Sequence, residues 1–395
     1  MELKILQIDD KCTGCGACVS ACPKHCLTLS PNKDGFYYPH YDPTDCINCT
    51  LCEKVCHIVN PIDTKVVTKE NFYMYSSGDL ETRRLSSSGG AFSLFAEKIV
   101  EDGGIVFGST YNGEKERLEV SDSINNDWRC FRKSKYIESY MGDCYRRIAD
   151  LLKNNKKVFY CGTPCQIRGL KHYLNARNIS EIDLLTADFI CHGVPSNLCF
   201  TEYKKQFESR NKHVSSVDFR YKDFTKHKLA WHNMVLKLSF DNGSSKIIPY
   251  QAPHYYGYYK LFMDNIILRK CCYECHYPIV SVADITFADF WGISKYLPQT
   301  DDNTGISIVK IHSDKAKEMW SRLLEDANML PYSAVEYLYH TPNKAAIIAK
   351  RDCFFLNMHK KGYDKATREF YQKELIAFYT FGWVKQIAKK VLRKK

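Results

Sequence analysis

Eight cysteines within the first 56 residues have a spacing that suits iron chemistry. They form two runs with gaps of two, two and three residues, and the second run follows the first by 34 positions. Three closely spaced thiolates can bind three irons of one cubane, whereas the fourth lies too far along and reaches the other cluster. We therefore expect one 4Fe–4S cluster on Cys12, Cys15, Cys18 and Cys56, and another on Cys46, Cys49, Cys52 and Cys22.

Zinc is the simpler alternative for so many cysteines. A structural zinc site takes a tetrahedral set built from pairs of ligands, which two runs of four do not resemble. The stretch resembles the bacterial-type two-cluster ferredoxin over residues 1–61, with one departure: Pro23 follows Cys22, but His57 follows Cys56. The extra thiol of Cys26 is predicted to be a small buried residue.

Three more loops carry cysteine beyond a predicted linker over 57–71. Two of them follow predicted strands, and ligands collect at the carboxyl edge of an open α/β sheet. Two single thiols and one pair make a four-ligand set, suited to a further 4Fe–4S cluster or to zinc. From spacing alone, Cys161 with Cys165 and Cys271 with Cys275 remain rival pairings. The loops are Gly162-Thr163-Pro164-Cys165-Gln166, Cys191-His192-Gly193 and Cys271-Cys272-Tyr273-Glu274-Cys275.

Five motifs occur in order along the chain: Ser86-Ser87-Ser88-Gly89-Gly90, Gly162-Thr163-Pro164-Cys165-Gln166-Ile167, Cys191-His192-Gly193-Val194-Pro195-Ser196, Cys272-x-x-Cys275 and Ala283-Asp284-Ile285-Thr286-Phe287-Ala288-Asp289-Phe290-Trp291-Gly292. Together they resemble the beta-subunit family of coenzyme F-420-reducing hydrogenases and dehydrogenases, over residues 72–312. The resemblance implies an FAD and a third 4Fe–4S cluster beside it. The implied ligands of that cluster are Cys165, Cys191, Cys272 and Cys275.

The serine- and glycine-rich motif precedes a predicted helix, so its backbone N–H groups and the helix dipole suit a pyrophosphate. His192 is the candidate proton donor at the flavin, with a hydrogen-bonded loop residue as the alternative. Arg168 is either a phosphate partner or a solvated helix residue. The candidate FAD-binding residues are Ser87, Ser88, Gly89, Gly90, Gly162, Thr163, Pro164, Gln166 and Asp289.

The elements that must position these loops alternate between strand and helix. We predict an α+β ferredoxin-like two-cluster module over 1–61, an α/β domain with a mixed sheet over 72–330, and a basic helical tail over 331–395. The leftover thiols Cys130, Cys144, Cys199 and Cys353 are expected to be buried. Predicted strands cover 104–108, 158–160, 182–190, 214–220, 234–240, 283–290 and 307–311, and predicted helices cover 91–100, 148–152 and 166–174.

The net charge of +11 is not evenly distributed. Residues 1–60 hold 5 Lys and Arg against 7 Asp and Glu, whereas residues 343–395 hold 14 against 4. The basic balance therefore belongs to the C-terminal tail, and no nucleic-acid-binding motif accompanies it. The helix expected over 383–395 fits either a surface helix, which we favour, or a peripheral contact with an anionic inner membrane.

Nineteen cysteines without a secretory start indicate metal chemistry in a reducing compartment, so we expect a cytoplasmic protein. The leading hypothesis is an iron–sulfur flavoprotein oxidoreductase that receives electrons from a ferredoxin or flavodoxin and reduces a small organic substrate. Ferredoxin-fused members of the family suggest a role in surface-polysaccharide synthesis. The alternatives are an electron-transfer subunit for a separate catalytic partner, a coenzyme F-420-dependent enzyme, and a redox-sensing regulator.

Overall fold

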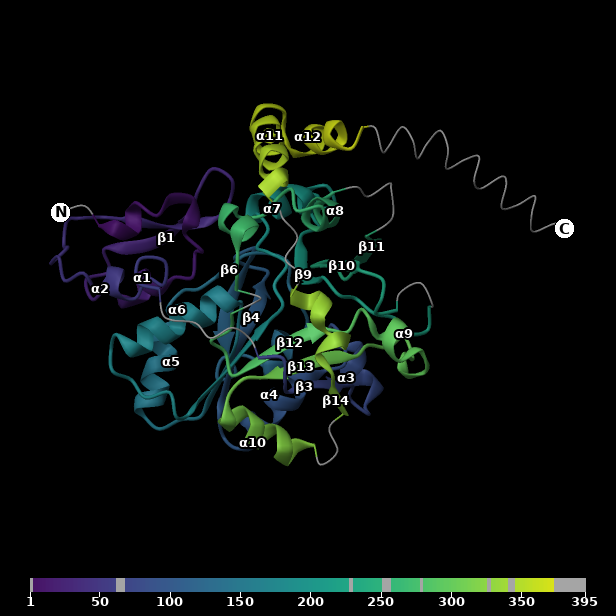
Figure 1. Cartoon of the computed structure of the whole chain (residues 1–395). Coiled ribbons are helices and arrows are strands. Elements are labelled where there is room, and N and C mark those ends of the chain that lie inside the picture. The colour runs from purple at the N-terminus through teal and green to yellow at the C-terminus, as the bar shows by residue number, and fades with distance from the viewer. Residues whose placement is uncertain are drawn as a thin grey trace.

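The computed structural model describes residues 3–61, 68–226, 230–250, 257–277, 280–324, 328–339 and 345–372. A small N-terminal module lies beside a larger domain built on a wide sheet (Figure 1). In the small module, strands β1 (Leu27–Pro31) and β2 (Tyr37–Tyr41) pair antiparallel. Helices α1 (Ala17–Ala21) and α2 (Leu51–Lys54) lie within the two cysteine runs, so the sequence repeat is also a structural repeat.

The larger domain is organised by a nine-stranded mixed sheet in the order β14-β3-β13-β12-β8-β7-β4-β5-β6. Its centre, β12-β8-β7-β4, is parallel, and β13, β3 and β14 extend it antiparallel. The strands are β3 (Phe72–Tyr75), β4 (Ile105–Asn112), β5 (Arg117–Asp122), β6 (Ser139–Tyr140), β7 (Val158–Cys161), β8 (Leu184–Phe189), β12 (Ile285–Asp289), β13 (Ser307–Ile311) and β14 (Asn328–Leu330).

Helices cover both faces of this sheet because its central strands are apolar on both sides. On β7, Val158 and Tyr160 pack with α5 (Cys144–Lys153) and α6 (Pro164–Asn175), and Phe159 packs with α4 (Ala91–Glu101) and α10 (Asp314–Leu323). The α5 and α6 layer also contacts α1, so it lies between the sheet and the N-terminal module.

A second sheet, β11-β10-β9, flanks the first. A turn at Asp241–Gly243 joins β10 to β11, and Gly243 takes the left-handed conformation that such a turn requires. The remaining elements are α3 (Leu80–Arg84), α7 (Asn197–Lys205), α8 (Tyr258–Met263), α9 (Ile293–Tyr296), β9 (Val214–Asp218), β10 (Val235–Phe240) and β11 (Ser245–Pro249).

The C-terminal part is helical as predicted in α11 (Ala345–Lys361) and α12 (Tyr363–Phe370). In α11, Arg351 donates to the Leu268 carbonyl at 2.8 Å and to Asp34 of the N-terminal module at 3.1 Å, so this helix fastens the two units together. The basic helix expected over 383–395 lies outside the described residues. Among the described helices, none is long and apolar enough to cross a membrane.

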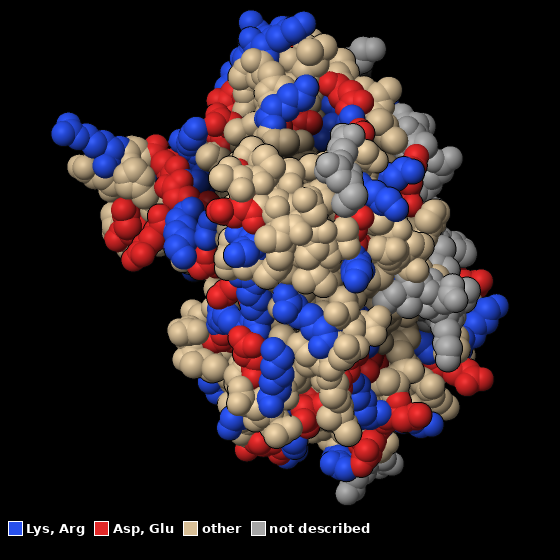
Figure 2. Space-filling view, turned by 90° about the vertical axis from the view of Figure 1, so that its left-hand side faces the viewer, with Lys and Arg blue, Asp and Glu red and all other residues tan. Residues whose placement is uncertain are grey.

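Positive and negative side chains are interspersed on the face that carries the N-terminal module (Figure 2). That face therefore shows no single-sign field of the kind that binds nucleic acid. The burial predicted for the leftover thiols holds for Cys144 and Cys199, but it is wrong for Cys130 and Cys353, which are exposed.

Candidate functional site

The eight N-terminal cysteines line two separate hollows. One, of about 380 Å³, is lined by the first three cysteines of run one together with the last cysteine of run two. The other, of about 360 Å³, is lined by the first three of run two, the last of run one, and the extra thiol Cys26. The structure thus brings together the two crossed sets expected from the spacing: Cys12, Cys15, Cys18 and Cys56, and Cys22, Cys46, Cys49 and Cys52.

The backbone follows the same path in both runs. Gly14 and Gly16 have φ of 68° and 76°, and Asn48 and Thr50, 34 positions later, have φ of 52° and 57°. Left-handed residues at these positions let the chain curl around a central group, at little cost for glycine and at a larger cost for Thr50.

Burial raises the pKa of the Cys15 thiol to about 12, and it also raises the pKa of Cys12 and Cys18. Several thiolates packed in such surroundings need a cationic core to neutralise them, which an iron–sulfur cluster supplies. Cys26 has a different contact, because its backbone N–H donates to Cys22 Sγ at 3.3 Å. That bond fits a residue that supports a ligand.

Three cysteines of the third set, Cys165, Cys191 and Cys272, lie close together beyond the ends of β7 and β8, on the edge predicted from the sequence. The Cys165 side chain contacts the Thr163 hydroxyl at 3.1 Å, and the Val194 N–H donates to Cys272 Sγ at 3.4 Å. Burial raises the pKa of the Cys165 thiol; the Thr163 contact lowers it, and Cys191 and Cys272 raise it further. These thiols are therefore electrostatic neighbours.

The other three cysteines of these loops have distinct surroundings. Burial raises the pKa of Cys161 to about 12, and its charged neighbours are Asp188 and Lys135 rather than the thiols of the third set. Cys275 interacts electrostatically with Arg168, whereas the Cys271 thiol shares a hydrogen bond with the Cys272 thiol. The structure therefore separates Cys161 from the third set and keeps Cys271 close to it.

Three arginines of the larger domain bind main-chain carbonyls of the N-terminal module. Arg146 donates to the Val19, Ser20 and Cys22 carbonyls at 3.1, 2.8 and 2.9 Å, Arg177 to Ala21 at 3.1 Å, and Arg269 to Cys12 at 2.9 Å. At the same boundary, a Cβ added to Gly169 of α6 would lie 2.9 Å from Cys15 Sγ. Gly169 follows Cys165 by about one helical turn, so the first and third cysteine sets adjoin.

Two residues at this boundary are buried. His57, the first residue of the predicted linker, is 3 % exposed, and burial lowers its pKa to about 3, with contributions from His172 and Arg168. The interpretation of Arg168 as a solvated helix residue is wrong, because it is 4 % exposed and lies 4.6 Å from the ring centroid of Tyr277.

Around the Ser86–Gly90 loop lies a group of side chains that we call the basic cluster: Lys133, Lys135, Arg220 and Lys222. Arg220 donates to the Ser87 carbonyl at 3.1 Å and to Asp289 at 2.6 Å. Lys222 donates to the Ser88 carbonyl at 3.2 Å and to the Thr304 carbonyl at 2.9 Å.

The basic cluster has more positive than negative charge. Lys133 pairs with Asp218 at 2.6 Å and Arg220 with Asp289, so four cations face two carboxylates. Burial lowers the pKa of Lys222 to about 7, with Arg220 and Lys133 lowering it further. An uncompensated, desolvated cation of this kind favours an anionic ligand. No sequence pattern indicates this cluster, because two basic residues such as Arg220 and Lys222 after a strand look the same in the sequence whether they are buried or exposed.

Several predicted flavin contacts already have internal partners. The Gly89 N–H donates to the Ser307 hydroxyl at 3.0 Å, and a Cβ there would lie 2.1 Å from the Tyr75 carbonyl oxygen. The Gln166 amide accepts from the Thr163 N–H at 2.9 Å and donates to the Ser139 hydroxyl at 2.9 Å. If a phosphate bound at this loop, its negative charge would therefore be neutralised chiefly by the basic cluster.

The remaining predicted residues are placed as follows. His192 Nε2 lies 3.3 Å from the Phe262 carbonyl oxygen, and its ring packs edge-on against that phenyl ring. Pro164 occupies the first turn of α6, where the missing N–H costs nothing. Gly162 approaches the Tyr160 hydroxyl so closely that a Cβ would lie 2.7 Å from it.

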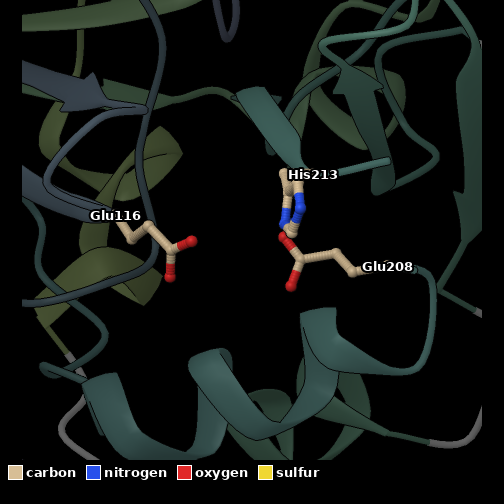
Figure 3. A group of neighbouring side chains, drawn as sticks. All are labelled: Glu116, Glu208 and His213. Atoms are coloured by element: carbon tan, nitrogen blue, oxygen red, sulfur yellow. The ribbon is translucent and has the colours of Figure 1, made fainter. Parts of the chain in front are cut away.

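A separate group, Glu116, Glu208 and His213, has the composition of a cation site (Figure 3). The buried ammonium of Lys204 donates to Glu116 at 2.9 Å and to Glu208 at 2.9 and 3.1 Å. A cation is thus already supplied by the chain itself.

The fold and the cysteine sets define an iron–sulfur protein that transfers electrons. A family model for the C terminus of the coenzyme F420 hydrogenase/dehydrogenase beta subunit matches residues 155–333, and one described as 4Fe-4S dicluster domain matches residues 11–58. The larger domain thus matches the C-terminal domain of this beta-subunit family over residues 155–333, and the N-terminal module matches the dicluster domain over residues 11–58. Both parts of the resemblance noted in the sequence are confirmed.

One curated protein and one solved structure are similar to this chain. An uncharacterized ferredoxin of Methanocaldococcus jannaschii is 40% identical over 67 residues, which span 17% of this chain and 84% of the ferredoxin. A chain of the F420-reducing NiFe hydrogenase complex from Methanosarcina barkeri is similar in structure, with a TM-score of 0.46 and 15% identity over 74% of this chain and 96% of that chain.

Proposed function

We propose that this chain is an iron–sulfur flavoprotein oxidoreductase, which takes electrons from a ferredoxin or flavodoxin and delivers them to a small organic substrate. When bound, three 4Fe–4S clusters carry single electrons and an FAD joins them to two-electron chemistry. The observation that carries the proposal is the contact of Cys15 with Gly169, one turn from Cys165. It brings the ferredoxin cysteines against the third set, in the domain that also holds the basic cluster.

The residues of the chain have separate roles in this proposal. The crossed N-terminal sets hold two clusters, and Cys165, Cys191, Cys272 and Cys275 hold the third. The basic cluster binds the diphosphate of FAD, since its two surplus charges match that group. His192 is the candidate proton donor at the flavin.

The test is anaerobic purification followed by iron, sulfide and flavin analysis. We expect about twelve irons per chain, as three cubanes require, together with one flavin that reduced ferredoxin reduces. A protein with eight irons and no flavin, or one whose flavin reduced ferredoxin leaves oxidised, would contradict the proposal.

A second candidate is an electron-transfer subunit whose catalytic site lies on another polypeptide. The description of the matched family as a beta subunit favours it. In that case the purified chain reduces its own flavin but turns over no substrate without the partner. Coenzyme F420 as the acceptor is tested in the same assay through its absorbance.

The pH dependence of FAD binding follows from Lys222. Two of the three N–H groups of its ammonium are used by carbonyls, and a diphosphate would accept from the third. The bound anion raises a pKa that stands near 7 in the free protein. Binding therefore takes up a proton, and affinity is highest below pH 7 and falls above it by up to about tenfold per pH unit.

Titration of FAD into flavin-free protein between pH 6 and 9 checks this expectation. Lys222→Met should bind more weakly at pH 6 and lose most of the pH dependence. The matched control is Lys295→Met, an exposed position on α9 that should leave the profile unchanged. A flat profile in the native chain would show that Lys222 does not face the anion.

A further inference from the structure

The His57 imidazole joins the N-terminal module to the larger domain through both of its nitrogens. Nε2 shares a hydrogen bond of 3.0 Å with the Thr13 hydroxyl, and Nδ1 shares one of 2.7 Å with the Tyr277 hydroxyl. Thr13 lies between Cys12 and Cys15 of the first cysteine set. The ring therefore contacts a residue of that set's loop on one side and a residue of the third set's loop on the other.

The positions of the two partners in the chain make this bridge short. His57 follows Cys56 directly, and Tyr277 follows Cys275 by two residues. A continuous path of covalent bonds and one hydrogen bond thus runs from Cys56 through His57 and Tyr277 to Cys275. At its two ends stand a member of the first cysteine set and a member of the third.

The bridge is held in place by packing. The Arg168 guanidinium lies 4.6 Å from the centroid of the Tyr277 ring, and its Nη2 donates to the Val280 carbonyl at 3.3 Å. On the other side, the His57 and His172 rings lie 6.1 Å apart, centroid to centroid. Tyr277 is therefore fixed between Arg168 and His57 in one orientation.

We propose that the His57–Tyr277 hydrogen bond is the contact through which single electrons cross from the N-terminal module into the larger domain. The inference rests on the proposed function, because it requires a cluster on the third cysteine set. One electron leaves the group bound by the first set, which is oxidised, and arrives at the group bound by the third, which is reduced. A donor of the ferredoxin or flavodoxin class replaces it, and no bond breaks and no proton moves.

The bridge has two rivals at the same boundary. Cys15 Sγ lies against the backbone at Gly169, but no hydrogen bond joins the two sides there among the described residues, so an electron would cross a van der Waals gap. Arg269 donates to the Cys12 carbonyl at 2.9 Å and precedes Cys272 by three residues, so it also links the first set to the third. Of the two hydrogen-bonded links, that between His57 and Tyr277 is the shorter, at 2.7 Å.

Tyr277→Phe tests the inference, because it removes the hydroxyl and leaves the ring beneath Arg168. We expect unchanged iron content and unchanged reduction of the N-terminal clusters by dithionite. The rate at which electrons reach the third cluster, measured by freeze-quench EPR, should fall several-fold. The magnetic interaction between the reduced first and third clusters should persist, since their separation is unchanged.

Two substitutions of His57 separate the two hydrogen bonds. His57→Asn places an amide where Nδ1 stands and preserves the bond to Tyr277, whereas His57→Gln places it near Nε2 and preserves the bond to Thr13. We expect the Asn variant to keep the native transfer rate and the Gln variant to slow as Tyr277→Phe does. If Tyr277→Phe loses iron, the comparison of the two His57 variants tests the bridge instead.

The outcomes distinguish the inference from the function on which it rests. Native rates in Tyr277→Phe with about twelve irons bound would overturn the bridge and leave the crossing to the Arg269 or Gly169 contact. If the native protein binds only about eight irons, it has no third cluster. The proposed function then fails, and the bridge fails with it. Equal slowing in the Asn and Gln variants would show that His57 acts only by positioning the modules.

Discussion

Cys165→Ser is expected to lose about four irons per chain and the electron supply to the proposed flavin, whereas Cys161→Ser keeps both. The two thiols stand four residues apart, and spacing alone allows either to be a ligand. In the structure, the charged neighbours of Cys161 are Asp188 and Lys135, whereas those of Cys165 include Cys191 and Cys272. Removing one thiolate from a four-ligand site leaves an iron without its ligand, so the cluster is lost.

Iron and sulfide analysis of the anaerobic proteins gives the result directly, and EPR of the reduced proteins shows which cluster is missing. The same comparison applies to Cys272→Ser against Cys271→Ser, where only the first should lose iron. Full iron in Cys165→Ser, or equal losses in Cys161→Ser, would show that the ligand set has been assigned wrongly.

Arg269→Met is expected to destabilise the docked N-terminal module by about 3–5 kcal/mol. Arg269 has 0% exposure and pairs with the buried Glu138 at 2.7 Å. It also donates to the Cys12 and Tyr37 carbonyls. Burial is the largest single influence and opposes its charge, but Glu138 and the other acidic neighbours together outweigh burial and keep the pKa of Arg269 above its ordinary value. Removing the arginine leaves the buried Glu138 carboxylate without its charge partner and two carbonyls without that donor.

Denaturant unfolding followed by tryptophan fluorescence measures the loss, and hydrogen exchange over residues 12–37 shows where it falls. The double variant Arg269→Met, Glu138→Leu should recover part of the stability, because the stranded charge is gone. Arg322→Met, on the exposed side of α10, is the matched control and should change stability by less than about 0.5 kcal/mol. A similarly small effect of Arg269→Met would mean that the module docks through other contacts.

The parts of this structure that the sequence predicted are those carried by local patterns. The spacing within the two cysteine runs predicts which cysteines come together, because a gap of two residues lets the backbone bring neighbouring cysteines around one centre. The central strands β7, β8 and β12 appear as apolar runs, since both of their faces are covered. Helices α4 and α6 follow from apolar spacing and from the glycine and proline at their starts.

The parts that sequence patterns miss depend on contacts between distant residues. β6 has two residues and β14 three, which is too short for a pattern, and both are strands only because a neighbour pairs with them. Arg220 and Lys222 look like any surface pair until the Ser86–Gly90 loop folds over them. Gln166 is a candidate FAD-binding residue in the sequence, and only the folded chain reveals that the α6 cap and the Ser139 hydroxyl use its amide.

Arg146 and Arg177 hold the N-terminal module chiefly through its peptide carbonyls, and Arg146 also contacts the His25 side chain at 3.1 Å. Every amino acid carries that carbonyl, so a change of side chain at these positions does not by itself remove the acceptor. The outward-facing side chains of the small module can therefore change in evolution while these bonds to the larger domain remain.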